Sequence, residues 1–370
     1  MTIPVNEPYV GENEIAYVMD CLQTGWISSE GKYISEFENK WAVYCGMKYG
    51  VAVSNGTVAL EIAVTALNLQ SGDEVILPSF TIISCAQAIT RNKGIPVLVD
   101  CDPETWCMDV TQVEAKITPH TRAIMPVHIY GHPVDMDPLR KLAQEHKLMI
   151  IEDAAEAHGG EYKGRKCGGL GDISIFSFYA NKIVTTGEGG MVLTNDEKQA
   201  EHLRSLRNLC FRKERRFYHT ELGNNYRLTN IQAAIGVAQI ERIEESVQKK
   251  RWMAGMYNNQ LSDIKGLSLP VERPWAKNVY WMYGIVIDPA FGIDAAEFAR
   301  RLAEKGVMTR PFFLGMHEQP VFHEMGLFKD EHYPITEYIA RQGLYLPSGM
   351  TITEAQIDQV CNAVRKILVH

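Results

Sequence analysis

A lysine and an aspartate each stand just after a short apolar segment of this sequence. Lys182 follows the apolar run 173–178 and precedes the glycine-rich segment 187–190 (GEGG). Asp153 closes a second apolar run, 148–151. Such runs are typical of strands that are buried on both faces of a parallel sheet. The sequence therefore predicts an amine and a carboxylate at the ends of two strands.

This pair of groups meets the requirements of pyridoxal 5'-phosphate (PLP). The cofactor forms a Schiff base with a lysine amine, and an acidic side chain keeps its pyridine nitrogen protonated. A lysine after a strand is common by itself, and an acidic residue at a strand end often caps a helix. The combination favours PLP. We predict Lys182 as the catalytic residue and cofactor anchor, and Asp153 as the partner of the pyridine nitrogen.

The segment 54–57 (SNGT) has the composition of an anion-binding turn. It follows the apolar run 50–53 and opens the helical pattern 58–69. Glycine lets the backbone approach a ligand closely, and the free amides at a helix start attract an anion. We predict that Gly56 and Thr57 hold the cofactor phosphate, with an ordinary N-cap turn as the alternative.

Two side chains beside the lysine and the aspartate are further candidates for binding the cofactor. Ser177 precedes Lys182 in the segment 177–182 (SFYANK) and would donate its hydroxyl to the phosphate. A buried serine bonded to the backbone is the alternative. Glu156 follows Asp153 closely enough to lie on the same side, and we expect it to approach the ring hydroxyl.

Composition restricts the class of protein. The chain has 370 residues, 46% of them hydrophobic and 22% charged, which predicts two globular domains with a large core. The net charge of -8 argues against general nucleic-acid binding, although a local pocket can still be basic. The 8 cysteines are scattered, which indicates reduced thiols. No apolar segment approaches the roughly 20 residues of a membrane span, and no signal peptide is recognisable, so we expect a cytoplasmic protein.

One histidine pair has the spacing of a metal site. His128 and His132 are separated as two ligands on one helix face would be. Gly131 and Pro133 favour a loop instead, and no acidic or cysteine partner lies at ligand spacing. We therefore predict structural histidines and no metal.

Apolar runs alternate with helical patterns over the first two thirds of the chain. The runs span residues 50–53, 74–77, 96–99, 123–127, 148–151, 173–178 and 190–193. Helical patterns such as 58–69 and 138–146 separate several of them. This alternation predicts an α/β domain with a mostly parallel sheet.

The pattern changes after residue 236. Residues 237–250 predict a connecting helix, followed by a strand at 280–287 and a helix at 294–305. A capping-box sequence at Thr353 predicts the start of a last helix. We therefore expect a large PLP-binding domain over residues 1–240 and a smaller α+β domain over 241–370.

These segments together resemble the DegT/StrS family of PLP-dependent nucleotide-sugar aminotransferases. The resemblance runs from Pro8 to the last helix and depends most on residues 25–29 (GWISS), 54–57 (SNGT), 152–156 (EDAAE), 177–182 (SFYANK) and 225–230 (NYRLTN). It implies an aspartate-aminotransferase-like fold (PLP transferase fold type I). It also implies a homodimer with shared active sites, and a cofactor that alternates between PLP and pyridoxamine 5'-phosphate. Lys182 would move the proton in each half of such a ping-pong reaction.

Within the family, the chain most resembles the enzymes that aminate C4 of GDP-4-keto-6-deoxymannose and make GDP-perosamine for O-antigen lipopolysaccharide. Residues 26–29, 126–131, 279–283 and 310–313 carry this likeness. It implies glutamate as the donor and 2-oxoglutarate as the co-product. Alternatives are a UDP- or dTDP-4-keto-6-deoxyhexose substrate, a sugar dehydratase, whose relatives carry histidine where this chain has Lys182, and a PLP-binding regulatory protein.

The resemblance also assigns residues beyond the cofactor pocket. It implies that Asn230 reaches the phosphate of the partner subunit's cofactor, and that the region 212–227 contributes to the neighbour's nucleotide-sugar pocket. The substrate-binding residues that it implies are Trp26, Ser28, Ser29, Tyr226, Arg227, Arg310 and Phe312. Many relatives place an aromatic residue over the pyridine ring, where this chain has Ile82; strand alternation would put Phe80 on the same face.

Overall fold

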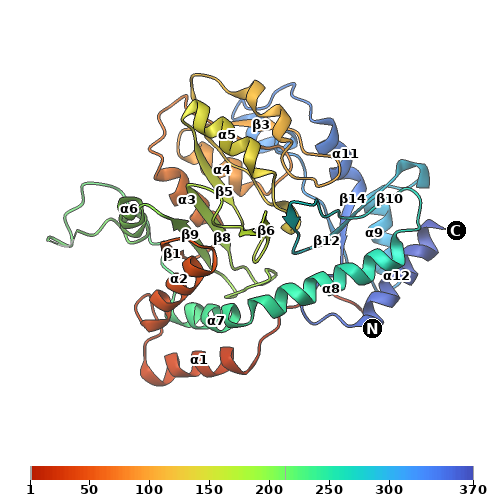
Figure 1. Ribbon diagram of the computed structural model, residues 1–370, viewed down its shortest axis with the longest axis horizontal. Helices are drawn as coiled ribbons and strands as arrows, with labels where there is room; N and C mark the ends of the chain where they lie inside the picture. Colours follow the sequence, from red (N-terminus) through yellow and green to blue (C-terminus); the bar gives the residue numbers. More distant parts are fainter. Residues whose placement is uncertain (1, 213, 370) are drawn as a thin grey trace.

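The computed structural model describes residues 2–212 and 214–369. Its largest element is a seven-stranded sheet, which Figure 1 shows at the centre of the larger part of the molecule. In spatial order the strands are β1 (Tyr49–Val53), β9 (Gly190–Thr194), β8 (Ile173–Ser177), β5 (Met149–Asp153), β4 (Thr121–Ile124), β2 (Glu74–Pro78) and β3 (Ile95–Val99). All seven predicted apolar runs therefore form strands of one sheet.

The sheet is parallel from β3 to β8, and β9 runs antiparallel to both of its neighbours. The predicted mostly parallel sheet is confirmed. The exception arises because a loop without a helix joins β8 to β9, and such a connection returns the chain in the opposite direction. That loop carries Lys182.

Helices cover both faces of this sheet. They are α2 (Lys32–Tyr44), α3 (Gly56–Thr65), α4 (Ser84–Arg91), α5 (Met136–His146), α6 (Glu197–Arg207) and α7 (Asn230–Glu241). Helix α1 (Glu12–Thr24) packs on α7, and Figure 1 shows it as the outermost helix of this part. A buried apolar cluster fills the space between the helices and the sheet. This is the layered α/β arrangement that the sequence predicts.

The C-terminal part has its own sheet and its own apolar core. The sheet contains β10 (Leu267–Ser268), β12 (Tyr283–Ile287), β14 (Gly343–Leu346) and β13 (Arg310–Pro311), and the helices are α9 (Ala295–Glu304), α10 (Pro320–Glu324), α11 (Pro334–Gln342) and α12 (Glu354–Leu368). Three short strands, β6 (Glu161–Tyr162), β7 (Arg165–Lys166) and β11 (Ala276–Lys277), form a further small sheet. The predicted capping box at Thr353 is present.

The predicted connecting helix is two helices with a break at Arg242. Helix α7 ends at Glu241, and α8 (Ile243–Leu261) continues into the C-terminal part, as Figure 1 shows. The N-terminal segment departs from the expected division of the chain. Ile3 forms a bridge with Val307 and belongs to the C-terminal core, so the first residues pack with the smaller part.

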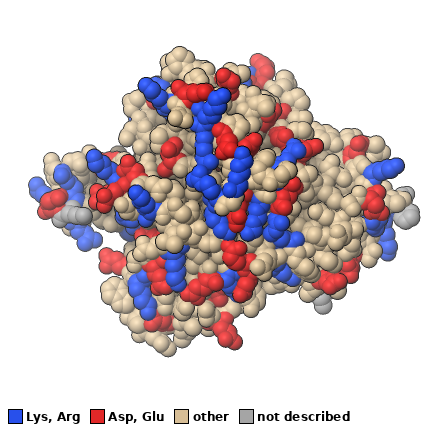
Figure 2. Space-filling model, viewed as in Figure 1, with Lys and Arg blue, Asp and Glu red and all other residues tan. Residues whose placement is uncertain are grey.

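Charged residues of both signs are interspersed over the face shown in Figure 2. Lysine and arginine gather on the segment that projects from the large domain beyond α6. Among the described residues, no helix combines the length and the apolar character that a membrane crossing requires.

Candidate active site

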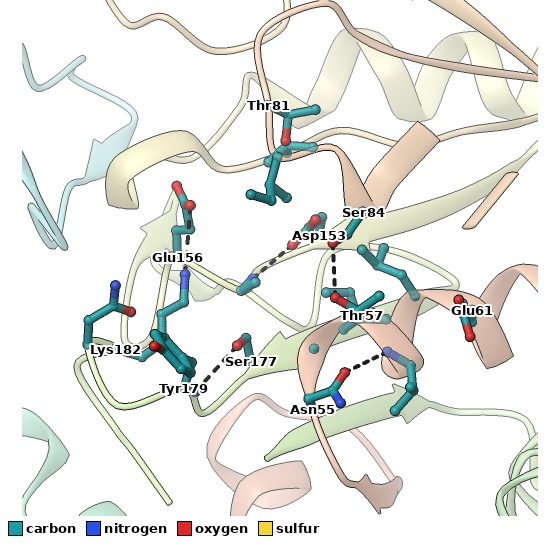
Figure 3. Close-up of a pocket in the computed structure, with 18 of the residues that line it drawn as sticks. Asn55, Thr57, Glu61, Thr81, Ser84, Asp153, Glu156, Ser177, Tyr179 and Lys182 are labelled. Atoms are coloured by element: carbon teal, nitrogen blue, oxygen red, sulfur yellow. Dashed lines mark hydrogen bonds and ion pairs between the residues drawn. The ribbon is translucent and has the colours of Figure 1, made fainter. Parts of the chain in front are cut away.

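A cavity of about 730 Å³ lies where β5 and β8 end and α3 begins (Figure 3). The cavity brings together most of the residues that the sequence predicts for cofactor binding. Its lining includes Gly56, Thr57, Ile82, Asp153, Glu156, Ser177 and Lys182, and also Tyr226 from the predicted substrate set. The ends of two adjacent parallel strands therefore supply the carboxylate and the loop that holds the amine.

The amine of Lys182 lies between a carboxylate and an aromatic ring. Its Nζ is 3.7 Å from Oε1 of Glu156, a contact drawn in Figure 3, and 3.5 Å from the centroid of the Trp281 ring. Its side chain is only 10% exposed. Burial lowers the pKa of Lys182, while Glu156 and Asp153 oppose that change. A lysine in this setting can act as a nucleophile and exchange a proton.

Asp153 is buried at the end of β5. One carboxylate oxygen accepts a hydrogen bond from the backbone N–H of Ala155 at 3.0 Å, and the other accepts one from the Cys85 thiol at 3.2 Å. No Lys, Arg or His among the described residues forms an ion pair with it. Burial raises its pKa, and these two bonds and the charge of Lys182 oppose the rise. A buried carboxylate without an ion-pair partner suits a protonated ring nitrogen.

Glu156 is also buried, and its two oxygens have different partners. One oxygen faces Lys182, and the other accepts the backbone N–H of Tyr130 at 2.8 Å. Burial raises the pKa of Glu156, against the opposing charge of Lys182. Its carboxyl group lies beside the amine, where it can exchange a proton.

The start of α3 lies at the wall of the cavity, where the sequence predicts an anion cradle. Asn55 caps the helix by accepting the Val58 N–H at 3.0 Å, and the first amides of a helix have no partner within it. A Cβ on Gly56 would stand 2.6 Å from the Cβ of Ser177, so only glycine permits this close approach of helix and strand. The hydroxyl of Thr57, in the first turn of α3, lies 2.9 Å from that of Ser84, the first residue of α4 (Figure 3).

These residues fit PLP. The α3 cradle and the Ser177 hydroxyl offer donors for a phosphate, Asp153 offers a buried anion for the ring nitrogen, and Lys182 offers the amine for the aldehyde. The surroundings of each side chain suit the role assigned to it, and the roles themselves stay predictions.

The expected position of Phe80 is wrong. Strand β2 ends at Pro78, so strand alternation does not extend to this side chain. Phe80 is fully buried in an aromatic cluster with Tyr130 and Phe312. Ile82 does line the cavity, where its side chain offers a ring only an aliphatic contact.

The sequence analysis assigned no binding role to several residues that line the cavity; Asn55, Tyr179 and Glu188 lie inside segments that it singled out, and most of the others come from distant segments. These lining residues include Asn55, Glu61, Thr81, Ser84, Arg91, Tyr179, Glu188, Trp281, Phe313 and Tyr345. Trp281 and Phe313 lie inside segments singled out for the family resemblance, which was the only available signal. The side chains of Trp281 and Phe313 reach the cavity only through the packing of the smaller part against the large sheet.

Two residues from the predicted set lie outside the main cavity. The side-chain amide of Asn230 donates to the Trp26 carbonyl at 2.7 Å and accepts from the Tyr33 N–H at 3.1 Å, and the residue is buried. The contact of Asn230 with the partner subunit's cofactor stays a prediction. Phe312 is buried beside Phe80, and its neighbour Phe313 lines the cavity instead.

The remaining predicted substrate residues lie outside the main cavity. Trp26 and Ser28 are exposed in the turn after α1, and Arg310 is exposed on β13, opposite Tyr345 in register. Ser29 and Arg227 line a second cavity of about 460 Å³, together with Arg204, Arg207 and Arg216. One folded chain thus assembles the cofactor set but not the substrate set.

His128 and His132 face different partners. His128 pairs with the buried Glu152 at 3.0 Å, while His132 accepts the Arg273 N–H at 3.2 Å. His128, Glu152 and Cys167 have ligand atoms within 4.8 Å of one another. However, Glu152 also accepts backbone N–H groups from the loop 168–171 and the Ser174 hydroxyl, so hydrogen bonds already account for this group.

The fold and the site define a PLP-dependent aminotransferase. Residues 8–365 match the model of the DegT/DnrJ/EryC1/StrS aminotransferase family, and the chain belongs to that family. This confirms the predicted family, the fold class and the class of enzyme.

Named relatives align over almost the whole chain. GDP-perosamine synthase of Caulobacter vibrioides is 43% identical, covering 99% of this chain and 98% of its own. GDP-perosamine synthase of Escherichia coli O157:H7 is 41% identical, covering 98% of each. The structure of DesI, solved in the presence of its TDP-sugar product, aligns with a TM-score of 0.91 at 31% identity, covering 100% of this chain and 93% of that one.

Proposed function

We propose that this enzyme transfers an amino group from glutamate to C4 of GDP-4-keto-6-deoxymannose and produces GDP-perosamine, a sugar for O-antigen lipopolysaccharide. The observation that carries the transfer reaction is the buried Lys182 amine, which faces Glu156 and shares a cavity with the unpaired carboxylate of Asp153. The choice of nucleotide and sugar is supported by the two GDP-perosamine synthases that are 41% and 43% identical to the chain.

Each side chain of the cavity has a part in this reaction. PLP, when bound, supplies an electron sink for the carbon next to the transferred nitrogen. Lys182 Nζ would anchor the cofactor and then take up and return the proton, a role that suits it because burial lowers its pKa. Glu156 faces the Lys182 amine, and the buried carboxylate of Asp153 would face the ring nitrogen, whose positive charge favours the anionic form of Asp153. Ser177 and the start of α3 fix the phosphate.

We further propose that a second copy of the chain completes the substrate site. The apolar side chains of Ile15, Met19, Leu22 and Trp26 are 45–60% exposed and recur at helical spacing along α1 and the turn after it. Phe217 and Leu222 are 81% and 92% exposed on the segment that projects beyond α6. Exposed apolar surface of this extent favours a partner, and a homodimer would bring the exposed substrate residues toward a neighbouring cavity.

A substrate panel tests the proposal. Purified enzyme with PLP and glutamate is offered GDP-4-keto-6-deoxymannose and matched UDP- and dTDP-4-keto-6-deoxyhexoses, and the amino sugar is measured by mass spectrometry. We expect amination of the GDP sugar at a kcat/KM at least about tenfold above the others, and no product with Lys182→Ala. A 3-deoxy product would contradict amino transfer.

The second candidate is a dTDP-sugar aminotransferase. It is favoured by the structural likeness to DesI, whose structure was solved with a TDP-sugar product. A higher kcat/KM with the dTDP sugar in the same panel would replace the first candidate by this one.

A further inference from the structure

Trp281 forms one wall of the site around Lys182. The centroid of its ring lies 3.5 Å from the lysine Nζ, within the range of a cation–π contact. The indole N–H donates to the carbonyl of Asn181, the residue before Lys182, at 2.8 Å. The ring and its N–H therefore contact both the amine and the backbone that carries it.

A buried lysine holds the backbone of Trp281. Lys250, on α8, is only 1% exposed, and its Nζ donates to the Trp281 carbonyl at 2.9 Å and to the Ser348 carbonyl. Among the described residues, no carboxylate forms an ion pair with it. Burial lowers the pKa of Lys250 to about 7. A buried amine without a counter-ion is costly to keep, which argues for a specific role.

The same contacts tie the smaller part of the chain to the active site. Ser348 follows β14, and its N–H donates to the carbonyl of Val5 in the N-terminal segment. The Ser348 hydroxyl accepts the N–H of Tyr283 at the start of β12. Asn6 donates to the carbonyl of Asn181 at 3.2 Å, beside the indole bond. Lys250 thus lies at the junction of the connecting helix, the N-terminal segment and the Trp281 loop.

We propose that Lys250 is a positioning residue that, through the carbonyl oxygens of Trp281 and Ser348, holds the Trp281 indole against the amine of Lys182. It acts through Trp281 and touches neither Lys182 nor the cavity. The inference rests on the proposed role of Lys182. Its test, however, needs no turnover, so its failure would leave the proposed function untouched.

The test measures how fast Lys182 is acetylated in the full-length chain freed of PLP. Acetic anhydride is added at a fixed pH, and peptides are quantified by mass spectrometry, with the exposed Lys305 as internal reference. The titratable groups near Lys182, which are Glu156, Asp153 and the imidazole of His158, are unchanged in every variant. With Lys250→Met, we expect Lys182 to react about three- to tenfold faster, because the ring that covers and stabilises the ammonium is released.

Lys249→Met is the matched control. Lys249 lies on the same helix, donates to the Ile352 carbonyl at 2.8 Å and stacks on Trp252, away from the active site. We expect this variant to leave the acetylation of Lys182 unchanged. Lys250→Gln keeps a hydrogen-bond donor, but its side chain is one bond shorter than that of lysine. We expect it also to speed the acetylation of Lys182, so it replaces the methionine variant if that variant is unstable.

A double-mutant cycle separates positioning from general loosening. In a Trp281→Leu background, Lys250→Met should add no further acceleration, because the ring through which it acts is gone. The proposal is overturned if folded Lys250 variants label Lys182 at the original rate. It is also overturned if the effects of the two substitutions simply multiply.

Discussion

The two cavities that contain the predicted site residues differ in how complete they are within one chain. The first holds buried groups whose partners come from the same chain: Glu156 bonds Tyr130 and faces Lys182, and Asp153 bonds Ala155 and Cys85. The second is lined by four arginines and one glutamate. Within it, Arg227 bonds Asn208 at 2.6 Å, while Arg216 is exposed on the segment that projects from the domain.

This difference between the two cavities indicates which of the two binding sites is already assembled within a single chain. A cofactor that stays bound is best served by side chains fixed in advance, and burial with mutual hydrogen bonds fixes them. A nucleotide sugar enters and leaves at every turnover, and arginines at an open surface suit its diphosphate. We therefore expect substitutions in the first cavity to change the chemistry, and those in the second to change substrate affinity.

The strongest test of this division is Asp153→Asn. Loss of a buried charge that faces the ring nitrogen should lower kcat about 10- to 100-fold, since a charge-assisted hydrogen bond is worth about 1.5–3 kcal/mol. Cys85→Ala is the control, because it removes only the thiol bond to Asp153 and should cost far less. Steady-state rates at saturating sugar measure both. Equal losses in the two variants would show that the charge is unimportant.

Arg227→Ala tests the second cavity. We expect KM for the nucleotide sugar to rise about tenfold with little change in kcat, because one arginine contact to a diphosphate is lost. Absorbance of the bound cofactor should stay the same. A loss of cofactor absorbance with unchanged KM would reverse the assignment of the two cavities.

Glu156→Gln tests the electrostatics beside the amine. The carboxylate favours the ammonium form of Lys182, so its removal should lower the pKa of Lys182. The rate of acetylation of Lys182, followed against pH, should then rise at a lower pH. Glu188→Gln is the control, since Glu188 lines the same cavity without an ion pair to the amine. If the pH at which the acetylation rate is half-maximal rises in Glu156→Gln, the account is contradicted.

The smallest kinetic effect is expected from Phe312→Leu. Phe312 packs on Phe80 and Trp106 in the core, so this change should cost about 1–2 kcal/mol of unfolding free energy and leave KM within twofold. Phe313→Leu, at the cavity wall, should raise KM and change the unfolding free energy little. Denaturant unfolding and steady-state kinetics separate the two; a raised KM in Phe312→Leu alone would restore it as a substrate residue.

Local patterns predicted the parts of the site that one strand end or one turn creates. Asp153, Ser177 and the turn at Gly56 lie at the ends of apolar runs, and parallel strands bring such ends together. The antiparallel β9 was not foreseen, because an apolar run has no direction. Phe80 was misplaced because the strand ends two residues earlier, at Pro78.

Contacts between distant segments left no local signal. The Trp281 ring contacts Lys182 and the Trp281 carbonyl accepts a hydrogen bond from Lys250 of α8, and no spacing in the sequence encodes that arrangement. Asn230 was given a role by likeness to the family alone. Its burial against Trp26 and Tyr33 depends on how α1 and α2 pack on α7.

The central claim is that Lys182 is the residue that binds the cofactor covalently. The most direct measurement is to incubate the full-length chain with PLP, reduce it with borohydride and locate the modified lysine by peptide mass spectrometry. We predict one phosphopyridoxyl group on Lys182, and a loss of the modification in Lys182→Ala. An unmodified Lys182, with the group on another lysine or on none, would contradict the account.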